Sequence, residues 1–135
     1  MYIRAMKQMH TYYIGVGSNL ENGIEVISEA CETLTEALEA EVRFSQPCMT
    51  APIDFPYPAL FANCVAEVST LLTTKRVDSV LKRLEVEFGR TAEDRAVGIV
   101  ALDLDILSVD GKIIRPTDCQ RPYIQEAFLE LGVNF

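Results

Sequence analysis

The sequence predicts an α+β domain in which an antiparallel sheet carries two long helices on one face. Strand and helix patterns follow one another in the order β-α-β-β-α-β, which is the ferredoxin-like arrangement. Both helical patterns are apolar on one side only, so each helix needs a single sheet face to cover. A β-hairpin and a C-terminal helix follow this core. The 135 residues are enough for one domain with a buried core.

The first half of the chain is expected to form strand, helix and strand. Thr11–Val16 predicts the first strand, which Gly17-Ser18-Asn19 closes. Apolar residues then recur every three or four positions and predict a helix from Gly23 to Ala40. A second strand is expected over Val42–Met49, interrupted by Pro47. Three prolines between positions 50 and 58 predict an irregular loop.

The second half is expected to repeat the order and to add two shorter elements. Phe61–Leu71 predicts a strand, and Thr74–Phe88 predicts an amphipathic helix. Arg90–Val100 has no periodicity and predicts a loop. After the next strand, Asp110-Gly111 favours a tight hairpin turn. Tyr123–Leu131 predicts a terminal helix.

Composition narrows the class of protein. The net charge of −8 argues against nucleic acid or an anionic membrane as the main partner. The four cysteines form no CxxC pair, and the chain has a single histidine, His10, which argues against a zinc site. Buried free thiols in a reducing cytoplasm are therefore expected. Residues 1–10 lack the apolar stretch of a signal peptide and are interpreted as an N-terminal extension before a single domain at 11–135. We expect a cytoplasmic monomer.

The most informative segment is the alternating run Ala101–Leu107. Successive side chains of a strand point to opposite faces, so Asp103 and Asp105 share a face and lie about 7 Å apart. Two neighbouring acids on an otherwise apolar strand repel one another. Hard oxygen ligands at this spacing suit one or two Mg²⁺ ions, and a solvated strand face is the alternative.

Several short motifs, taken together, resemble one enzyme family. The motifs are Gly17-Ser18-Asn19-Leu20, Thr50-Ala51-Pro52-Ile53, Phe61-Ala62-Asn63, Arg83-Leu84-Glu85, Gly89-Arg90 and Asp103-Leu104-Asp105. In this order and spacing the chain resembles the 6-hydroxymethyl-7,8-dihydropterin pyrophosphokinases of folate biosynthesis, from about Thr11 to Phe128. These enzymes transfer pyrophosphate from ATP to the pterin and release AMP.

The resemblance implies a set of phosphate and nucleotide contacts. Asp103 and Asp105 would hold two Mg²⁺ ions that bridge the ATP phosphates and the pterin hydroxyl. Arg90 would contact the phosphates as a catalytic residue, since guanidinium matches phosphate geometry. Glu85 would accept hydrogen bonds from the nucleotide, and Ile106 would pack against the adenine. A surface arginine, a solvated glutamate and a core isoleucine are the respective alternatives.

The resemblance also implies a pterin site. Asn63 is the main candidate because a carboxamide offers both a donor and an acceptor to the edge of the ring. Thr50, Pro52 and Ile53 would offer backbone groups and an apolar wall. Phe61 and Phe128 would sandwich the ring, with ordinary core packing as the alternative for each.

The chain departs from the family near the expected phosphate site. The usual pattern before the two acids is close to R-W-G-P-R-x-L-D-L-D, whereas Val97 stands here for the tryptophan and Val100 for the second arginine. The C-terminal segment lacks the usual histidine and arginine, with Arg95 and Arg121 as candidate substitutes. Two further readings therefore stay open. One is a weak or inactive homologue that serves as a pterin- and nucleotide-binding module, and the other is a metal-dependent transferase with another small acceptor.

Overall fold

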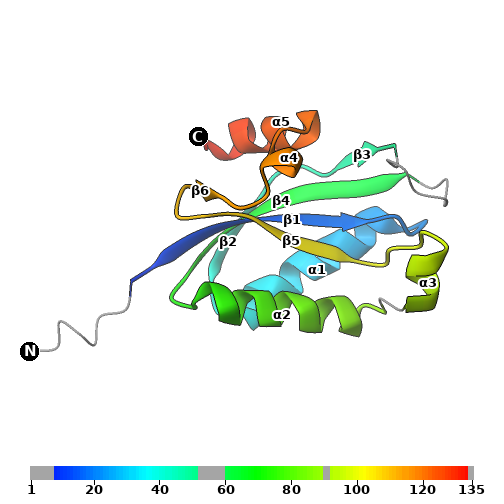
Figure 1. The fold of residues 1–135 in the computed structure, drawn as a ribbon, viewed down its shortest axis with the longest axis horizontal. Helices are drawn as coiled ribbons and strands as arrows, with labels where there is room; N and C mark the ends of the chain where they lie inside the picture. Colours follow the sequence, from blue (N-terminus) through cyan, green and yellow to red (C-terminus); the bar gives the residue numbers. More distant parts are fainter. Residues whose placement is uncertain (1–7, 52–59, 90–91, 134–135) are drawn as a thin grey trace, which may run out of the picture.

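The structure, a computed structural model, describes residues 8–51, 60–89 and 92–133, without the side chain of Arg95. It confirms the α+β prediction, with one antiparallel sheet between two helical layers (Figure 1). The strands are β1 (His10–Ser18), β2 (Glu41–Phe44), β3 (Cys48–Thr50), β4 (Phe61–Thr70), β5 (Asp103–Val109) and β6 (Lys112–Ile113). The helices are α1 (Gly23–Ala37), α2 (Thr74–Glu87), α3 (Ala92–Ala96), α4 (Pro116–Cys119) and α5 (Pro122–Leu131).

The sheet has the strand order of the predicted arrangement. Its path is β2-β4-β1-β5-β6, with β3 also paired to β4. The central strand β1 pairs with β4 from His10 to Ser18 and with β5 from Tyr12 to Gly17. The long helices α1 and α2 cover one face, while α4 and α5 lie on the other (Figure 1).

Each face of the sheet has its own apolar cluster. The larger cluster packs β1 side chains such as Ile14 against Leu34 of α1 and Leu81 of α2. The smaller cluster packs β4 and β5 against α5, whose buried side chains include Phe128. The apolar side that the sequence pattern predicts for each long helix is therefore the side that packs on the sheet.

The differences from prediction lie at the ends of elements and in short segments. The β1 strand begins at His10, so this residue belongs to the sheet rather than to an extension. The expected second strand is two strands, β2 and β3, which pair with successive parts of β4 on either side of Pro47. The expected helix from Gly23 to Ala40 ends earlier, at Ala37.

Two short helices were not predicted. Ala92–Ala96 forms α3 within the segment expected to be a loop, and α4 spans Pro116–Cys119. Helices of about one turn are too short to show an apolar periodicity.

The four cysteines are free thiols. Three of them, Cys31, Cys64 and Cys119, are buried as expected, whereas Cys48 is half-buried. Within the described ranges, no helix is both long enough and apolar enough to span a membrane.

Candidate active site

Two glycines of the central strand form the floor of the site. In the sheet, Gly17 lies between Asn63 of β4 and Asp103 of β5, and Gly15 lies beside Asp105. Residues directly opposite one another in antiparallel strands project to the same face. The side chains of Asn63, Asp103 and Asp105 therefore surround two positions that carry no side chain. A Cβ added at Gly17 would lie 3.2 Å from the Oδ1 atom of Asn63, so the glycine keeps this space open.

A cavity of about 820 Å³ rises from this floor on the face that carries α4 and α5. It brings together five of the predicted site residues, which come from β3, β4 and β5: Thr50, Phe61, Asn63, Asp103 and Asp105. The opposite wall comes from the segment 115–126 and includes Arg115, Asp118, Arg121 and Tyr123. The volume is in the range typical of small-molecule sites.

The alternation predicted around the two acids is present in β5. Leu102 and Leu104 are buried in the α1–α2 cluster, whereas Asp103 and Asp105 line the cavity. Burial and the neighbouring Asp103 carboxylate raise the pKa of Asp105 to about 7, although the Arg115 guanidinium opposes this shift. The two carboxylates therefore repel one another, and a bound divalent cation would offset this repulsion.

The donor set fits Mg²⁺. In the described ranges, no cluster of three or more His, Cys, Asp or Glu side chains could hold a metal. Mg²⁺ is commonly held by one or two carboxylates, with phosphate oxygens and water as its remaining ligands. The two aspartates match that pattern and do not match a closed zinc site.

Asn63 is buried and held in one orientation. Its Nδ2 atom donates to Thr50 Oγ1 at 2.8 Å and to the Phe61 carbonyl at 3.3 Å. These two bonds use both hydrogens of the carboxamide. The sequence suggested that Asn63 would offer a donor and an acceptor. In the structure its Nδ2 atom is bonded within the protein, and its Oδ1 atom lies beside Gly17.

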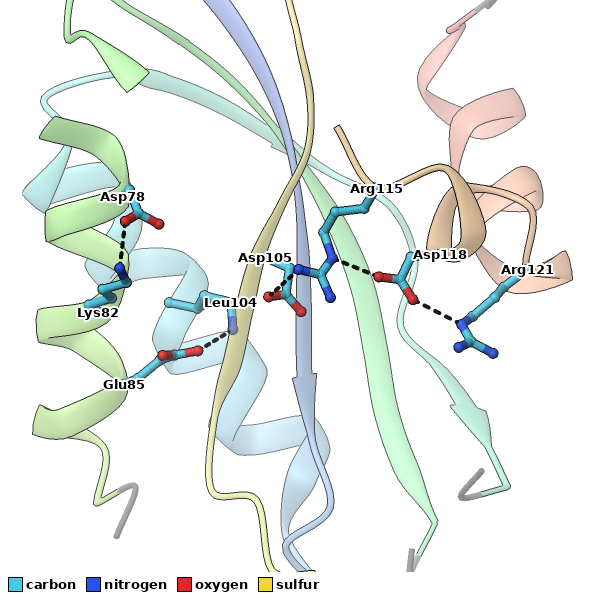
Figure 2. Close-up of polar contacts among 8 residues, drawn as sticks. All are labelled: Asp78, Lys82, Glu85, Leu104, Asp105, Arg115, Asp118 and Arg121. Atoms are coloured by element: carbon cyan, nitrogen blue, oxygen red, sulfur yellow. Dashed lines mark hydrogen bonds and ion pairs between the residues drawn. The ribbon is translucent and has the colours of Figure 1, made fainter. Parts of the chain in front are cut away.

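The opposite wall carries a chain of ion pairs, shown in Figure 2. Arg115 Nη1 lies 3.7 Å from Asp105 Oδ1, and Arg115 Nε lies 2.7 Å from Asp118 Oδ2. The second oxygen of Asp118, Oδ1, lies 3.2 Å from Arg121 Nε. The sequence had suggested Asp105 and Arg121 but neither Arg115 nor Asp118. For Asp118 the sequence holds a weak signal, since a proline followed by an acid, as in Pro116 and Asp118, is typical of the first turn of a helix.

The predicted nucleotide residues lie apart from the cavity floor. Glu85 of α2 accepts a hydrogen bond from the Leu104 amide at 2.8 Å (Figure 2). Ile106 lines a second hollow of about 470 Å³ between α2 and β5. This hollow shares Asp105 and Arg115 with the main cavity, so the two spaces adjoin at the acid and the arginine.

Phe128 does not line the cavity. Its side chain is 3% exposed, and its ring meets Tyr13 edge-on with centroids 5.7 Å apart. It follows Ile124 by four positions, so both lie on the buried side of α5. That spacing could have indicated core packing from the sequence. The aromatic residue of α5 that lines the cavity is Tyr123, and burial raises its pKa.

The Gly-Ser-Asn motif fixes the loop that leads into the two acids. Asn19 Oδ1 accepts a hydrogen bond from the Val100 amide at 2.6 Å, and its Nδ2 donates to the Gly98 carbonyl at 2.6 Å. Val100 is 7% exposed. The position where the family usually has an arginine is therefore part of the packed interior. Three further predicted site residues, Arg90, Pro52 and Ile53, lie outside the described residues.

Comparison with known proteins places the chain in a family. Residues 13–132 match the model of the 7,8-dihydro-6-hydroxymethylpterin-pyrophosphokinases. A 2-amino-4-hydroxy-6-hydroxymethyldihydropteridine pyrophosphokinase of Aquifex aeolicus is 34% identical over 107 residues, which are 79% of this chain and 66% of that protein. One of Haemophilus influenzae is 32% identical over 111 residues, covering 79% and 67%. The Folate synthesis bifunctional protein of Arabidopsis thaliana is 28% identical over 126 residues, covering 87% and 26%.

The sheet and the cavity that it carries define the class of the protein as an α+β domain with a ferredoxin-like arrangement. The chain belongs to the 7,8-dihydro-6-hydroxymethylpterin-pyrophosphokinase family, because the family match spans most of its length. It matches about two thirds of the length of the two bacterial relatives, 66% and 67%.

Proposed function

We propose that this protein transfers a pyrophosphoryl group from ATP to 6-hydroxymethyl-7,8-dihydropterin. The pterin hydroxyl oxygen attacks the β-phosphorus of ATP, and the bond from that phosphorus to the oxygen bridging it to the α-phosphorus breaks. That oxygen leaves as part of AMP, and the hydroxyl proton passes to solvent. The products are AMP and the pterin diphosphate, which precedes the later steps of folate biosynthesis.

The observation that carries this proposal is the position of the acids beside the pterin-side residues. Asp103 and Asn63 flank Gly17 in neighbouring strands, so a ring bound at Asn63 has its substituent near the two carboxylates. The Asn63 oxygen can accept from the amino and ring N–H groups of a pterin. Phe61 and Tyr123 line the same cavity and supply flat apolar surfaces for the ring.

The second hollow suits the other substrate. It is lined by Ile106, the predicted adenine contact, and it opens onto Asp105 and Arg115. ATP lying with its base there would have its phosphates at the junction of the two spaces. Asp103 and Asp105 would hold Mg²⁺, which neutralises phosphate charge and aligns the reacting oxygens. Positioning and charge neutralisation supply most of the catalysis in this kind of reaction.

The test is a direct assay of AMP formation from ATP and the hydroxymethyl-dihydropterin, with and without Mg²⁺. AMP should appear only with pterin and Mg²⁺. It should fall at least a hundredfold in Asp103→Ala and in Asp105→Ala, since each change removes charge stabilisation of about 3 kcal/mol or more. Glu87→Gln, which removes an acid from the exposed surface of α2, is the matched control and should be fully active.

Absence of AMP from the wild-type protein would contradict the proposed activity. If calorimetry still showed pterin and Mg-ATP binding, the chain would be a binding module that keeps the family's fold. The burial of Val100 and the exposure of Val97 at the positions of the usual arginine and tryptophan make this the second candidate.

A further inference from the structure

One carboxylate on the wall of the cavity joins two arginines. Asp118 lies between Arg115 and Arg121 and uses one oxygen for the Nε atom of each, at 2.7 Å and 3.2 Å (Figure 2). All three side chains line the cavity opposite Asp103 and Asp105. Arg115 also lies 3.7 Å from Asp105, so the chain of charges runs from the acids of β5 to the start of α5.

The geometry of these contacts matters because two guanidinium groups repel one another. A carboxylate between the two guanidinium groups offsets this repulsion and lets both stay close together. Each contact uses the inner nitrogen, Nε, and Figure 2 shows the terminal nitrogens of Arg121 on the side away from Asp118. The terminal nitrogens are those that make paired contacts with phosphate oxygens. Asp118 thus orients the arginines and does not cover the nitrogens that bind phosphate.

Asp118 is itself held firmly. It is 28% exposed and lies in the one-turn helix α4, where the Cys119 amide bonds to the Arg115 carbonyl at 3.0 Å. The Arg121 amide bonds to the Asp118 carbonyl at 3.1 Å. Burial alone would raise the pKa of Asp118, but hydrogen bonds from the two arginines outweigh it and hold this pKa below its usual range. The carboxylate therefore stays ionised at neutral pH.

We propose that Asp118 is a positioning residue that holds Arg115 and Arg121 as a two-pronged clamp for the polyphosphate of the nucleotide. This inference rests on the proposed function and deepens it. Val100 stands where the family usually has an arginine. The clamp supplies positive charge instead from Arg115 and Arg121, which flank α4. Holding two long side chains in advance also lowers the entropy that binding must remove.

Replacing Asp118 separates this role from simple electrostatics. A carboxylate near bound phosphates repels them, so removal of its charge alone would tighten binding of a polyphosphate. The clamp predicts the opposite. In Asp118→Asn only the amide oxygen can accept, so one arginine loses its partner and faces a donor instead.

The probe is Mg²⁺ with α,β-methylene-ATP, whose bridging carbon prevents the transfer step. Calorimetry should show binding about ten times weaker in Asp118→Asn than in wild type, and Asp118→Glu should recover part of the loss. In turnover, KM for ATP should rise much more than kcat falls. Glu87→Gln, which removes an acid paired with Arg83 on the surface of α2, should bind as wild type does.

A double-mutant comparison guards against a purely structural effect. If Asp118 acts through the arginines, Asp118→Asn should cause little further loss in a protein that already carries Arg115→Ala and Arg121→Ala. Unchanged or tighter binding in Asp118→Asn would overturn the clamp, even if AMP formation by the wild type stood. If wild type bound the analogue and Asp118→Asn bound it more weakly, the clamp would stand. If wild type then formed no AMP, the proposed activity alone would be overturned.

Discussion

At the scale of single residues, the two acids of β5 work against stability. Asp105 is half-buried, with about one third of its side chain exposed, and lies beside Asp103. Among the described residues, the guanidinium of Arg115, 3.7 Å away, opposes these effects. A carboxylate kept in such surroundings is typical of a functional site, where local stability is lost in favour of chemistry.

Neutralising Asp105 should therefore stabilise the metal-free protein. The folded-state pKa of about 7 lies above the ordinary value of 3.8, so the folded chain keeps a proton that the unfolded chain has lost. Its free energy of unfolding should then fall as pH rises from about 4 to 7. In Asp105→Asn this fall should disappear, and Tm above pH 7 in EDTA should rise by a few degrees. Thermal unfolding followed by circular dichroism between pH 4.5 and 8 measures both effects.

Glu87→Gln provides the comparison, since it removes one negative charge without touching the cavity. Identical pH slopes for wild type and Asp105→Asn would contradict the burial and repulsion assigned to this carboxyl. Added Mg²⁺ should reduce the difference between the two proteins, because metal binding favours the ionised form of a carboxylate.

At the scale of elements, the site depends on how β1 ends. After Ser18, the chain turns through Asn19, whose carboxamide bonds both to Gly98 and to Val100 in the segment before β5. The Asn19 amide also donates to the Val100 carbonyl at 3.0 Å. One fully buried side chain thus fixes the approach to Asp103, and this gives the Gly-Ser-Asn motif a structural role near the site.

Asn19→Ala should loosen this connection. The change leaves the Val100 amide and the Gly98 carbonyl without their partner, at a loss of about 2–4 kcal/mol for the pair. Urea unfolding should show the lower free energy of unfolding, and hydrogen exchange should become faster at Val100. AMP formation should also fall, because the loop leads into the two acids. Unchanged exchange at Val100 would show that other contacts hold the loop.

The helices and strands also differ in how well they can be predicted from the sequence. Helices α1 and α2 were predicted because each buries a regular apolar stripe against the sheet. The short helices α3 and α4 were missed because each is about one turn long and shows no apolar periodicity. The division of β2 from β3 was missed because it depends on where β4 finds partners.

At the scale of the whole molecule, two apolar clusters share one sheet. In β4, Ala66 belongs to the cluster under α1 and α2, while its neighbour Val65 belongs to the cluster under α5. Because the same strands serve both faces, we expect the described part of the chain to unfold as one cooperative unit.

Truncations in the two clusters test that expectation. Leu34→Ala should lower the free energy of unfolding by about 2–5 kcal/mol, and Phe128→Ala by about 3–5 kcal/mol. Each variant should keep a single transition, with the same midpoint by near- and far-ultraviolet circular dichroism. A separate early transition in Phe128→Ala would show that α5 unfolds independently. A role of Phe128 in packing alone also predicts that Phe128→Leu, which keeps an apolar side chain, leaves pterin affinity unchanged.

The site could be predicted only in part, for a reason that holds across the molecule. Asp103, Asp105 and Asn63 are on regular strands, so alternation and family resemblance were enough to predict residues that line one cavity. Other features depend on how α4 and α5 pack on the sheet. These are the ion pair between Arg115 and Asp118, and the fact that Tyr123 lines the cavity where Phe128 was expected. Such packing is not encoded in any short motif.

The glycines beneath the cavity have a consequence for the whole fold. At Gly15 and Gly17 the sheet is only a backbone thick, and the next side chains of the same strand, Ile14 and Val16, are buried in the main core. A ligand resting there touches the strand on which the rest of the domain is assembled. Its binding energy therefore adds to the stability of the entire domain, not of a peripheral loop. Substrate and scaffold meet at a single layer of polypeptide.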